Sequence, residues 1–97
     1  MAVSDRLSCQ VRERADGVHL IVTGELDYSS RDAFNIAVRA VLTGYPGGVV
    51  LDLTAVRFVS SEGASSLIDA ARRAADAGTR LTILTSPPVW RRLELLG

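Results

Sequence analysis

The chain has 97 residues, of which 47% are hydrophobic and 23% are charged. This length suits one domain, and the composition is typical of a globular protein rather than a disordered one. Eleven basic side chains balance eleven acidic ones, so no net charge attracts the protein to nucleic acid or to an anionic membrane. We therefore expect a single domain over residues 1–97, with no direct nucleic-acid partner and no membrane partner.

Cysteine and histidine occur once each, at Cys9 and His19. A lone cysteine forms no internal disulfide, and these two residues are too few for a metal site, so we predict no bound metal and no cofactor. We interpret Cys9 as a small apolar strand residue. The N-terminus lacks the long apolar core of a signal peptide, and no segment approaches the length of a membrane span. The expected location is therefore the cytoplasm.

The beginning of the chain predicts an antiparallel hairpin. Residues 7–14 and 18–23 have the composition of strands, and Asp16-Gly17 between them is a strong turn signal. His19 is then expected on the polar face of this hairpin.

A first helix is expected after the segment of residues 24–27. The pair Ser29-Ser30 precedes it, and the glycine-rich run of residues 44–48 ends it. Residues at helical spacing form its apolar stripe: Phe34, Ala37, Val38, Val41 and Leu42.

Strands and helices alternate in the second half of the chain. Residues 49–53 form a short apolar run that is typical of a buried strand, and we expect a loop over residues 54–60. A helix over residues 61–77 should end at Gly78, because glycine just after a helix is a common left-handed stop. Its apolar face is expected to comprise Leu67, Ile68, Ala71 and Ala75.

A further strand is predicted over residues 81–84, and Pro87-Pro88 begins a last helix. This helix carries Val89, Trp90, Leu93 and Leu96. We interpret Trp90 as a core or rim anchor, whereas an exposed tryptophan there would be a partner contact. The alternation of strand and helix implies right-handed parallel crossovers, so the predicted class is α/β with an antiparallel start.

The junction at residues 60–61 joins the buried-strand pattern to a helix. Ser60 or Ser61 is the expected N-cap, whose side-chain oxygen accepts a hydrogen bond from a free backbone N–H of the first turn. The same free N–H groups and the helix dipole favour an anion. A phosphoserine would therefore be tolerated there and presented to solvent, although capping alone explains a serine at this position.

Four carboxylates lie near element ends, where structural hydrogen bonds are their expected role: Glu25, Asp27, Asp52 and Glu62. We expect Asp52 to accept hydrogen bonds from loop amides and Asp27 to cap the region of the first helix. The sequence contains neither the Gly-x-Ser-x-Gly elbow of a hydrolase nor a glycine-rich phosphate loop. We therefore expect that the protein is not an enzyme.

Three segments together carry a family resemblance. Gly24-Glu25-Leu26-Asp27 follows a strand, residues 50–53 lead into Phe58-Val59-Ser60-Ser61-Glu62-Gly63, and residues 90–97 end the chain. Their order and spacing resemble the STAS domain of bacterial anti-sigma factor antagonists over nearly the whole chain. The resemblance implies an α/β fold with a mixed sheet of about four strands, an antiparallel N-terminal hairpin and helices packed on the sheet. The family's final strand and last helix would lie beyond Gly97, absent or truncated.

In that family the unphosphorylated antagonist binds an anti-sigma factor that is also a serine kinase, which releases a sigma factor, and phosphorylation ends the binding. Alignment on Gly63 places the phosphoacceptor of the family's Asp-Ser-Ser/Thr-Gly motif at Ser61. The resemblance implies a cytoplasmic regulator of transcription, a monomer or weak dimer, whose partner is an anti-sigma factor serine kinase. The implied partner-binding residues are Gly24, Glu25, Asp27, Ser60, Ser61, Glu62 and Gly63.

The sequence departs from the family motif on both sides of Ser61. Ser60 stands where the family has aspartate, which keeps hydrogen-bonding capacity but loses a charge. Glu62 stands where the family has a second hydroxyl, and its carboxylate would repel a phosphate on Ser61. A second interpretation therefore stays open, in which the domain is an unphosphorylated accessory or scaffold subunit of a lipid-transport ATPase or of a signalling assembly.

Overall fold

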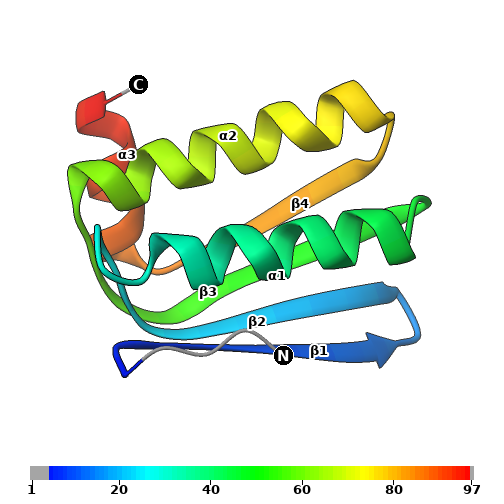
Figure 1. Ribbon diagram of the computed structural model, residues 1–97, viewed down its shortest axis with the longest axis horizontal. Helices are drawn as coiled ribbons and strands as arrows, with labels where there is room; N and C mark the ends of the chain where they lie inside the picture. Colours follow the sequence, from blue (N-terminus) through cyan, green and yellow to red (C-terminus); the bar gives the residue numbers. More distant parts are fainter. Residues whose placement is uncertain (1–4, 97) are drawn as a thin grey trace.

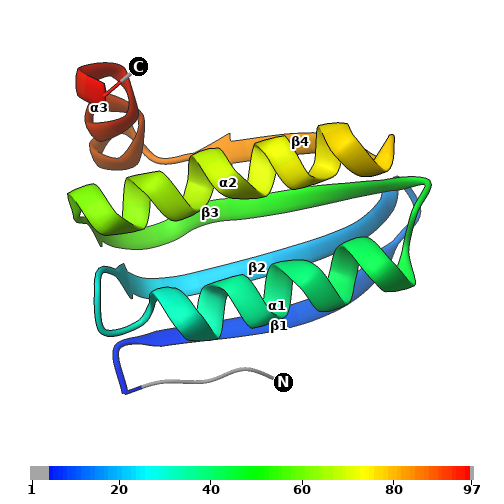
Figure 2. The same cartoon turned by 45° about the horizontal axis from the view of Figure 1, so that its top comes forward.

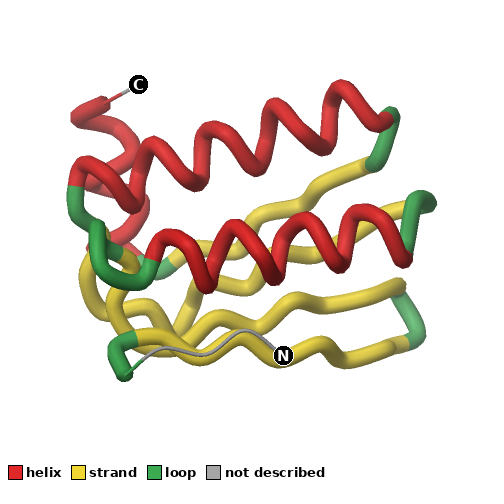
Figure 3. The backbone as a smooth tube through the Cα atoms, in the orientation of Figure 1, coloured by secondary structure: helices red, strands yellow, loops and turns green. Residues whose placement is uncertain are grey.

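The computed structural model describes residues 5–96, in which a hairpin of two strands is followed by alternating helices and strands (Figure 1). The elements are β1 (Leu7–Arg14), β2 (Gly17–Leu26), α1 (Arg31–Gly44), β3 (Gly48–Val59), α2 (Ser61–Ala77), β4 (Arg80–Thr85) and α3 (Pro87–Leu96). Short loops at the two ends of the molecule join them (Figure 3). The expected α/β class is confirmed.

The four strands form one mixed sheet in the order β1-β2-β3-β4. β1 and β2 pair antiparallel, whereas β2, β3 and β4 run parallel. The crossovers through α1 and α2 step in the same direction along the sheet, and right-handed crossovers then place both helices on one face. Figure 2 shows α1 over β1 and β2, and α2 over β3 and β4. The predicted mixed sheet with an N-terminal hairpin is thus confirmed.

The core lies between the sheet and these two helices. Alternate residues of β2 point into it, because successive strand side chains face opposite sides: Val18, Leu20, Val22 and Leu26. The predicted stripe of α1 is confirmed, since Phe34, Ala37, Val38 and Val41 are buried and Leu42 packs against them. Cys9 is buried in the same core, as expected of a small apolar strand residue, and burial raises the pKa of its thiol to about 11.

The loop predicted over residues 54–60 is wrong, because β3 continues to Val59. Irregular pairing with β2 explains the misleading pattern: the register shifts between Ile21 and Thr23 and again between Gly24 and Glu25. Extra residues on β3 break the alternation of apolar and polar positions. The carboxylate of Asp52 accepts hydrogen bonds from the backbone N–H (3.0 Å) and hydroxyl (2.6 Å) of Thr54. Asp52 therefore accepts a hydrogen bond from a backbone amide as expected, but this amide lies within the strand and not in a loop.

The bounds of α2 match the prediction, and Gly78 adopts the left-handed conformation with φ of 69°. The predicted apolar face is wrong in part: Leu67 is buried, whereas Ile68, Ala71 and Ala75 are exposed. The buried face comprises Gly63, Ala64, Ser66, Leu67, Ala70 and Ala74. Small side chains make up most of this face, so hydrophobicity alone did not reveal it. The predicted face was instead placed around the large apolar residue Ile68, which is exposed.

Helix α3 lies at the end of the sheet where β2, β3 and β4 finish, beside the first turn of α2 (Figures 1 and 2). We call this the carboxyl end of the sheet. Val89 is buried and Leu93 packs against the core, but Trp90 is 55% exposed and is therefore not a core residue. The alternative interpretation of Trp90, a partner contact, stays a prediction. The side chain of Leu96 and Gly97 lie outside the described residues. Within residues 5–96, no helix has the length and apolar character needed to cross a bilayer.

Candidate functional site

The carboxyl end of the sheet brings together two of the three segments that carry the family resemblance. Leu26, the last residue of β2, pairs with Val59, the last residue of β3. The backbone N–H of Ser60 donates to the carbonyl oxygen of Leu26 at 3.0 Å. The segment of residues 24–27 and the start of α2 are thus adjacent, although more than thirty positions separate them along the chain.

Ser60 is the N-cap of α2, which resolves the choice between the two serines. Its backbone is extended, with φ of −80° and ψ of 176°, and its hydroxyl accepts a hydrogen bond from the N–H of Gly63 at 3.1 Å. The carbonyl oxygen of Ser60 accepts from Ala64 at 2.8 Å. The N–H groups of Ser61 and Glu62 are left without an intrahelical acceptor, as the first turn of any α-helix requires.

Ser61 is the first residue of α2, and its side chain is exposed beside that of Glu62. Its hydroxyl takes no part in the cap. Arg92 of α3 donates from Nη2 to the Ser61 Oγ at 3.3 Å. The arrangement therefore presents a hydroxyl at a helix N-terminus, with a guanidinium on one side and a carboxylate in the next position.

The turn between β2 and α1 is organised by Asp27. Its Oδ1 accepts from the backbone N–H of Ser29 (3.0 Å), the hydroxyl of Ser29 (2.8 Å) and the N–H of Ser30 (3.1 Å). The Ser29 hydroxyl, together with Arg6 and the Ser30 amide, lowers the pKa of Asp27 to about 2, against the opposing effect of partial burial. Helix α1 begins just beyond this turn, and its N-cap Ser30 makes no side-chain cap. Asp27 therefore fixes the approach to the helix, close to the predicted capping role.

Arg6 is a residue of this site that sequence reasoning missed. Its Nη2 lies 2.6 Å from Oε1 of Glu25, and its Nε lies 2.6 Å from Oδ2 of Asp27. The backbone carbonyl of Arg6 accepts from the N–H of Glu25 at 2.9 Å. No short-range pattern indicates this bridge, because the pairing of β1 with β2 creates it.

Gly24 and Gly63 are buried, so both shape the site from within. Gly24 has φ of 113°, and a Cβ there would overlap the carbonyl oxygen of Arg6. A Cβ on Gly63 would overlap the carbonyl oxygen of Leu26. Of the other predicted partner-binding residues, Ser61 and Glu62 are exposed, while Glu25, Asp27 and Ser60 are partly exposed.

Large apolar side chains are exposed on the elements that meet at the carboxyl end. They include Tyr28 in the β2–α1 turn, Phe58 near the end of β3, and Trp90 and Leu95 on α3. The guanidinium of Arg31 lies 4.4 Å from the centre of the Tyr28 ring, a cation–π geometry. Exposed aromatic residues of this kind are typical anchors of protein interfaces.

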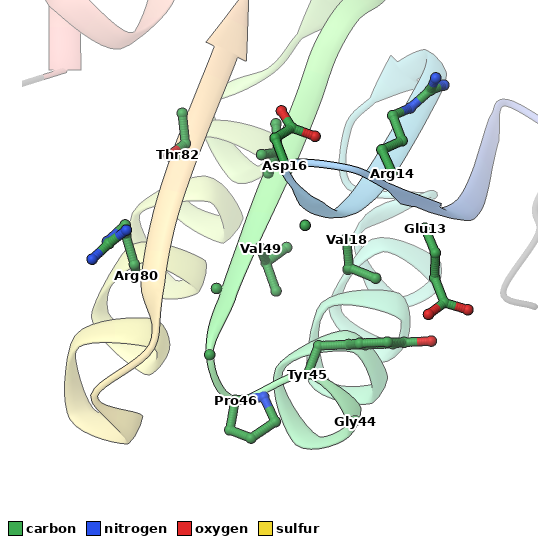
Figure 4. Close-up of a pocket in the computed structure, with 14 residues that line it drawn as sticks. Glu13, Arg14, Asp16, Val18, Gly44, Tyr45, Pro46, Val49, Arg80 and Thr82 are labelled. Carbon is green, nitrogen blue, oxygen red and sulfur yellow. The ribbon is translucent and has the colours of Figure 1, made fainter.

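The remaining polar candidates lie elsewhere. Asp52 is in the middle of β3, and His19 of the hairpin contacts Asp16 with Nε2 and Oδ1 2.8 Å apart. The described residues contain no group of three His, Cys, Asp or Glu side chains placed to hold a metal. A hollow of about 520 Å³ opens at the opposite end of the sheet, where Asp16, Tyr45 and Arg80 are among its lining residues (Figure 4). None of the predicted site residues lines it.

Comparison with known proteins shows the family to which the chain belongs. The family profile described as "Mlab, STAS domain" matches residues 9–97, and the chain therefore belongs to the STAS domain family. No curated protein matches the sequence at a significant level.

Three solved structures illustrate the similarity. An anti-sigma factor antagonist from Mycobacterium paratuberculosis is 26% identical, with a TM-score of 0.84 over 100% of this chain and 83% of its own. The STAS domain of an antisigma-factor antagonist from Rhodobacter sphaeroides is 21% identical, with a TM-score of 0.67 over 82% of this chain and 87% of its own. The anti-sigma factor antagonist SpoIIAA in its unphosphorylated form is 17% identical, with a TM-score of 0.66 over 93% of this chain and 84% of its own. The last two identities show a shared fold alone.

Proposed function

We propose that this protein is an anti-sigma factor antagonist that binds an anti-sigma factor serine kinase through the carboxyl end of its sheet and is switched by phosphorylation of Ser61. The observation that carries the proposal is the exposed hydroxyl of Ser61, which starts α2 directly beside the turn of residues 25–30. The similarity of the whole chain to the Mycobacterium paratuberculosis antagonist supports the same role.

The position of Ser61 suits a switch that alters a surface without unfolding the domain. The serine that caps α2 is Ser60, so the Ser61 oxygen is available for modification while the cap stays intact. A phosphate adds about 1.5–2 negative charges at pH 7. Placed within an interface, that charge must be desolvated and opposes any acidic partner group, so the complex weakens.

Glu62 sets how readily the switch operates. Its carboxylate is one position from the acceptor and opposes the arrival of a phosphoryl group, while the helix N-terminus favours both negative groups. We therefore expect Ser61 to be a slower substrate than the serine of a family member with a hydroxyl at the position of Glu62.

The test combines binding and phosphorylation by the anti-sigma factor kinase of the same organism. The unmodified protein should bind the kinase in calorimetry and, with ATP, should gain one phosphate that mass spectrometry maps to Ser61. Ser61→Ala should abolish the modification, whereas Ser65→Ala, at an exposed position on the same helix, should not. Glu62→Ser should raise the phosphorylation rate. A kinase that neither binds nor modifies the protein would refute the proposal.

A second candidate is a constitutive STAS subunit of a lipid-transport ATPase or a signalling assembly. The replacement of both motif neighbours of Ser61, by Ser60 and Glu62, favours this use because a fixed carboxylate makes a phosphate-dependent surface less effective. Affinity purification that recovers an ATPase subunit and no kinase, together with unmodified Ser61 in cells, would support this candidate over the first.

A further inference from the structure

Arg92 holds an unusual position beside the proposed acceptor. Helix α3 packs against β3 and the start of α2, which brings the Arg92 Nη2 to 3.3 Å from the Ser61 hydroxyl. The Nε of the same guanidinium is shut off from solvent and has no hydrogen-bond acceptor among the described residues. The charged group is therefore held in place by packing, with donor capacity left over.

Arg92 forms no ion pair with a carboxylate of the described residues. Arg57, Arg91 and Arg92 line a shallow groove of about 220 Å³ together with Phe58, Pro88 and Leu95, and no carboxylate lines it. The ion pairs found within residues 5–96 include none of these three arginines. This local excess of positive charge borders the one exposed hydroxyl that Arg92 contacts, in a chain whose total charge is balanced.

We propose that Arg92 is the phosphate-holding residue of the Ser61 switch, and that its ion pair with phosphoserine 61 ties α3 to the first turn of α2. This inference rests on the proposed phosphorylation of Ser61. In that step the Ser61 oxygen forms a bond to the γ-phosphorus of ATP, the bond from this phosphorus to the oxygen of ADP breaks, and the hydroxyl proton passes to a base of the kinase. ADP leaves with the displaced oxygen.

The chemistry of the two groups favours this pairing. A neutral hydroxyl offers a guanidinium one weak acceptor, whereas a phosphate offers three charged oxygens, and arginine binds phosphate through two parallel hydrogen bonds. The oxygens extend beyond Oγ, toward a donor that is already at hydrogen-bond distance. The guanidinium also offsets the repulsion from Glu62, which explains how a phosphate is tolerated beside a carboxylate.

The consequence reaches the partner surface through α3. Trp90 and Leu95 on this helix are exposed, at 55% and 79%. Formation of the ion pair fixes α3 against α2. The phosphate therefore changes the position of these apolar side chains as well as the charge of the surface. Arg92 is thus a positioning residue, which couples the chemical state of Ser61 to the apolar part of the interface.

The test uses the full chain with phosphoserine inserted at position 61 during translation, so that no kinase is needed. Phosphorus NMR then follows the second ionisation of the phosphate with pH. Arg92→Gln should raise this phosphate pKa by about 0.5–1 unit, whereas the matched control Arg91→Gln, on the exposed neighbour, should change it by much less. Arg92→Lys, which keeps the charge but loses the fork, should give an intermediate value.

A second readout is independent of the variants. The Arg92 Nε–H signal in nitrogen NMR should become slower to exchange with water in the phosphoserine protein than in the unmodified one. Equal phosphate pKa values for Arg92→Gln and Arg91→Gln, or an unchanged Nε–H signal, would overturn the inference while leaving kinase binding intact. Conversely, a kinase that ignores Ser61 would refute the proposed function even if Arg92 holds an inserted phosphate.

Discussion

The carbonyl oxygen of Leu26 occupies the space that a Cβ at Gly63 would need. The same carbonyl oxygen accepts the N–H of Ser60 at 3.0 Å. The backbone at the end of β2 therefore contacts the backbone of the first turn of α2. This close approach requires a residue without a side chain at position 63. This backbone contact sets the distance between the β2–α1 turn and Ser61.

Gly63→Ala should destabilise the protein by about 1–3 kcal/mol, because backbone atoms must move to admit the new methyl group. Gly44→Ala is the matched control: Gly44 ends α1, and a Cβ there meets nothing within 4 Å. The control should be neutral or stabilised by up to about 1 kcal/mol. Urea unfolding of both variants checks the difference, and equal stabilities would contradict the steric conflict between a side chain at position 63 and the Leu26 carbonyl.

The two serines at the start of α2 should separate in stability measurements. Ser60→Ala removes the oxygen that accepts from Gly63 and should cost about 0.5–2 kcal/mol. Ser61→Ala removes an exposed hydroxyl that, within residues 5–96, makes one side-chain hydrogen bond, the 3.3 Å bond from Arg92. The free energy of unfolding should therefore change by less than about 0.5 kcal/mol. Chemical denaturation of both variants makes the comparison, and a larger loss for Ser61→Ala would reverse the assignment of the cap.

Adjacent residues on α3 should divide stability from binding. Val89 is 1% exposed, and Val89→Ala should destabilise the fold by about 1–3 kcal/mol. Trp90→Ala removes a side chain that is 55% exposed and should leave stability within about 0.5 kcal/mol. Trp90 is also the single tryptophan of the chain, so its emission should shift to shorter wavelength when a partner covers α3. An unchanged spectrum in the complex would place the interface elsewhere.

Asp27 should make the stability depend on acid pH. Its pKa in the folded protein, about 2, lies below the usual value near 3.9, so the ionised form favours folding. That contribution is complete above about pH 5 and is lost as the pH falls toward 2. The melting temperature of Asp27→Asn should therefore be lower than that of the wild type at pH 6, and the difference should shrink between pH 5 and pH 2. A difference that is constant with pH would show that the Asp27 carboxylate adds nothing.

The sequence was sufficient where a local rule acts alone. The turn at Asp16-Gly17, the stop at Gly78 and the helix that starts at Ser61 follow from backbone preferences of single residues, and their positions agree with the structure. The second half of β3 was missed because its bulges destroy the period-two pattern, and bulges arise from pairing with β2. Likewise the buried face of α2 consists mostly of small residues, whose burial depends on how closely α1 approaches.

The site was foreseen through its motifs rather than through its contacts. The resemblance pointed to residues 24–27 and to Ser61, and the structure places them side by side. The contacts of Arg6 with Asp27 and of Arg92 with Ser61 were not foreseen, because each joins residues that are far apart in the sequence. Long flexible side chains of this kind show no periodicity, so a single sequence cannot indicate their partners.

The turn beside Ser61 is closed by its own hydrogen bonds. The buried hydroxyl of Ser30 donates to the carbonyl oxygen of Glu25 at 2.7 Å and accepts from the N–H of Asp27 at 3.0 Å. Ordering a free loop costs roughly 1–2 kcal/mol per residue, and a loop that is already ordered avoids this loss on binding. A partner that binds at this turn would therefore meet an ordered loop. The heat-capacity change of association should then correspond to the buried apolar area alone, without the excess that accompanies folding upon binding.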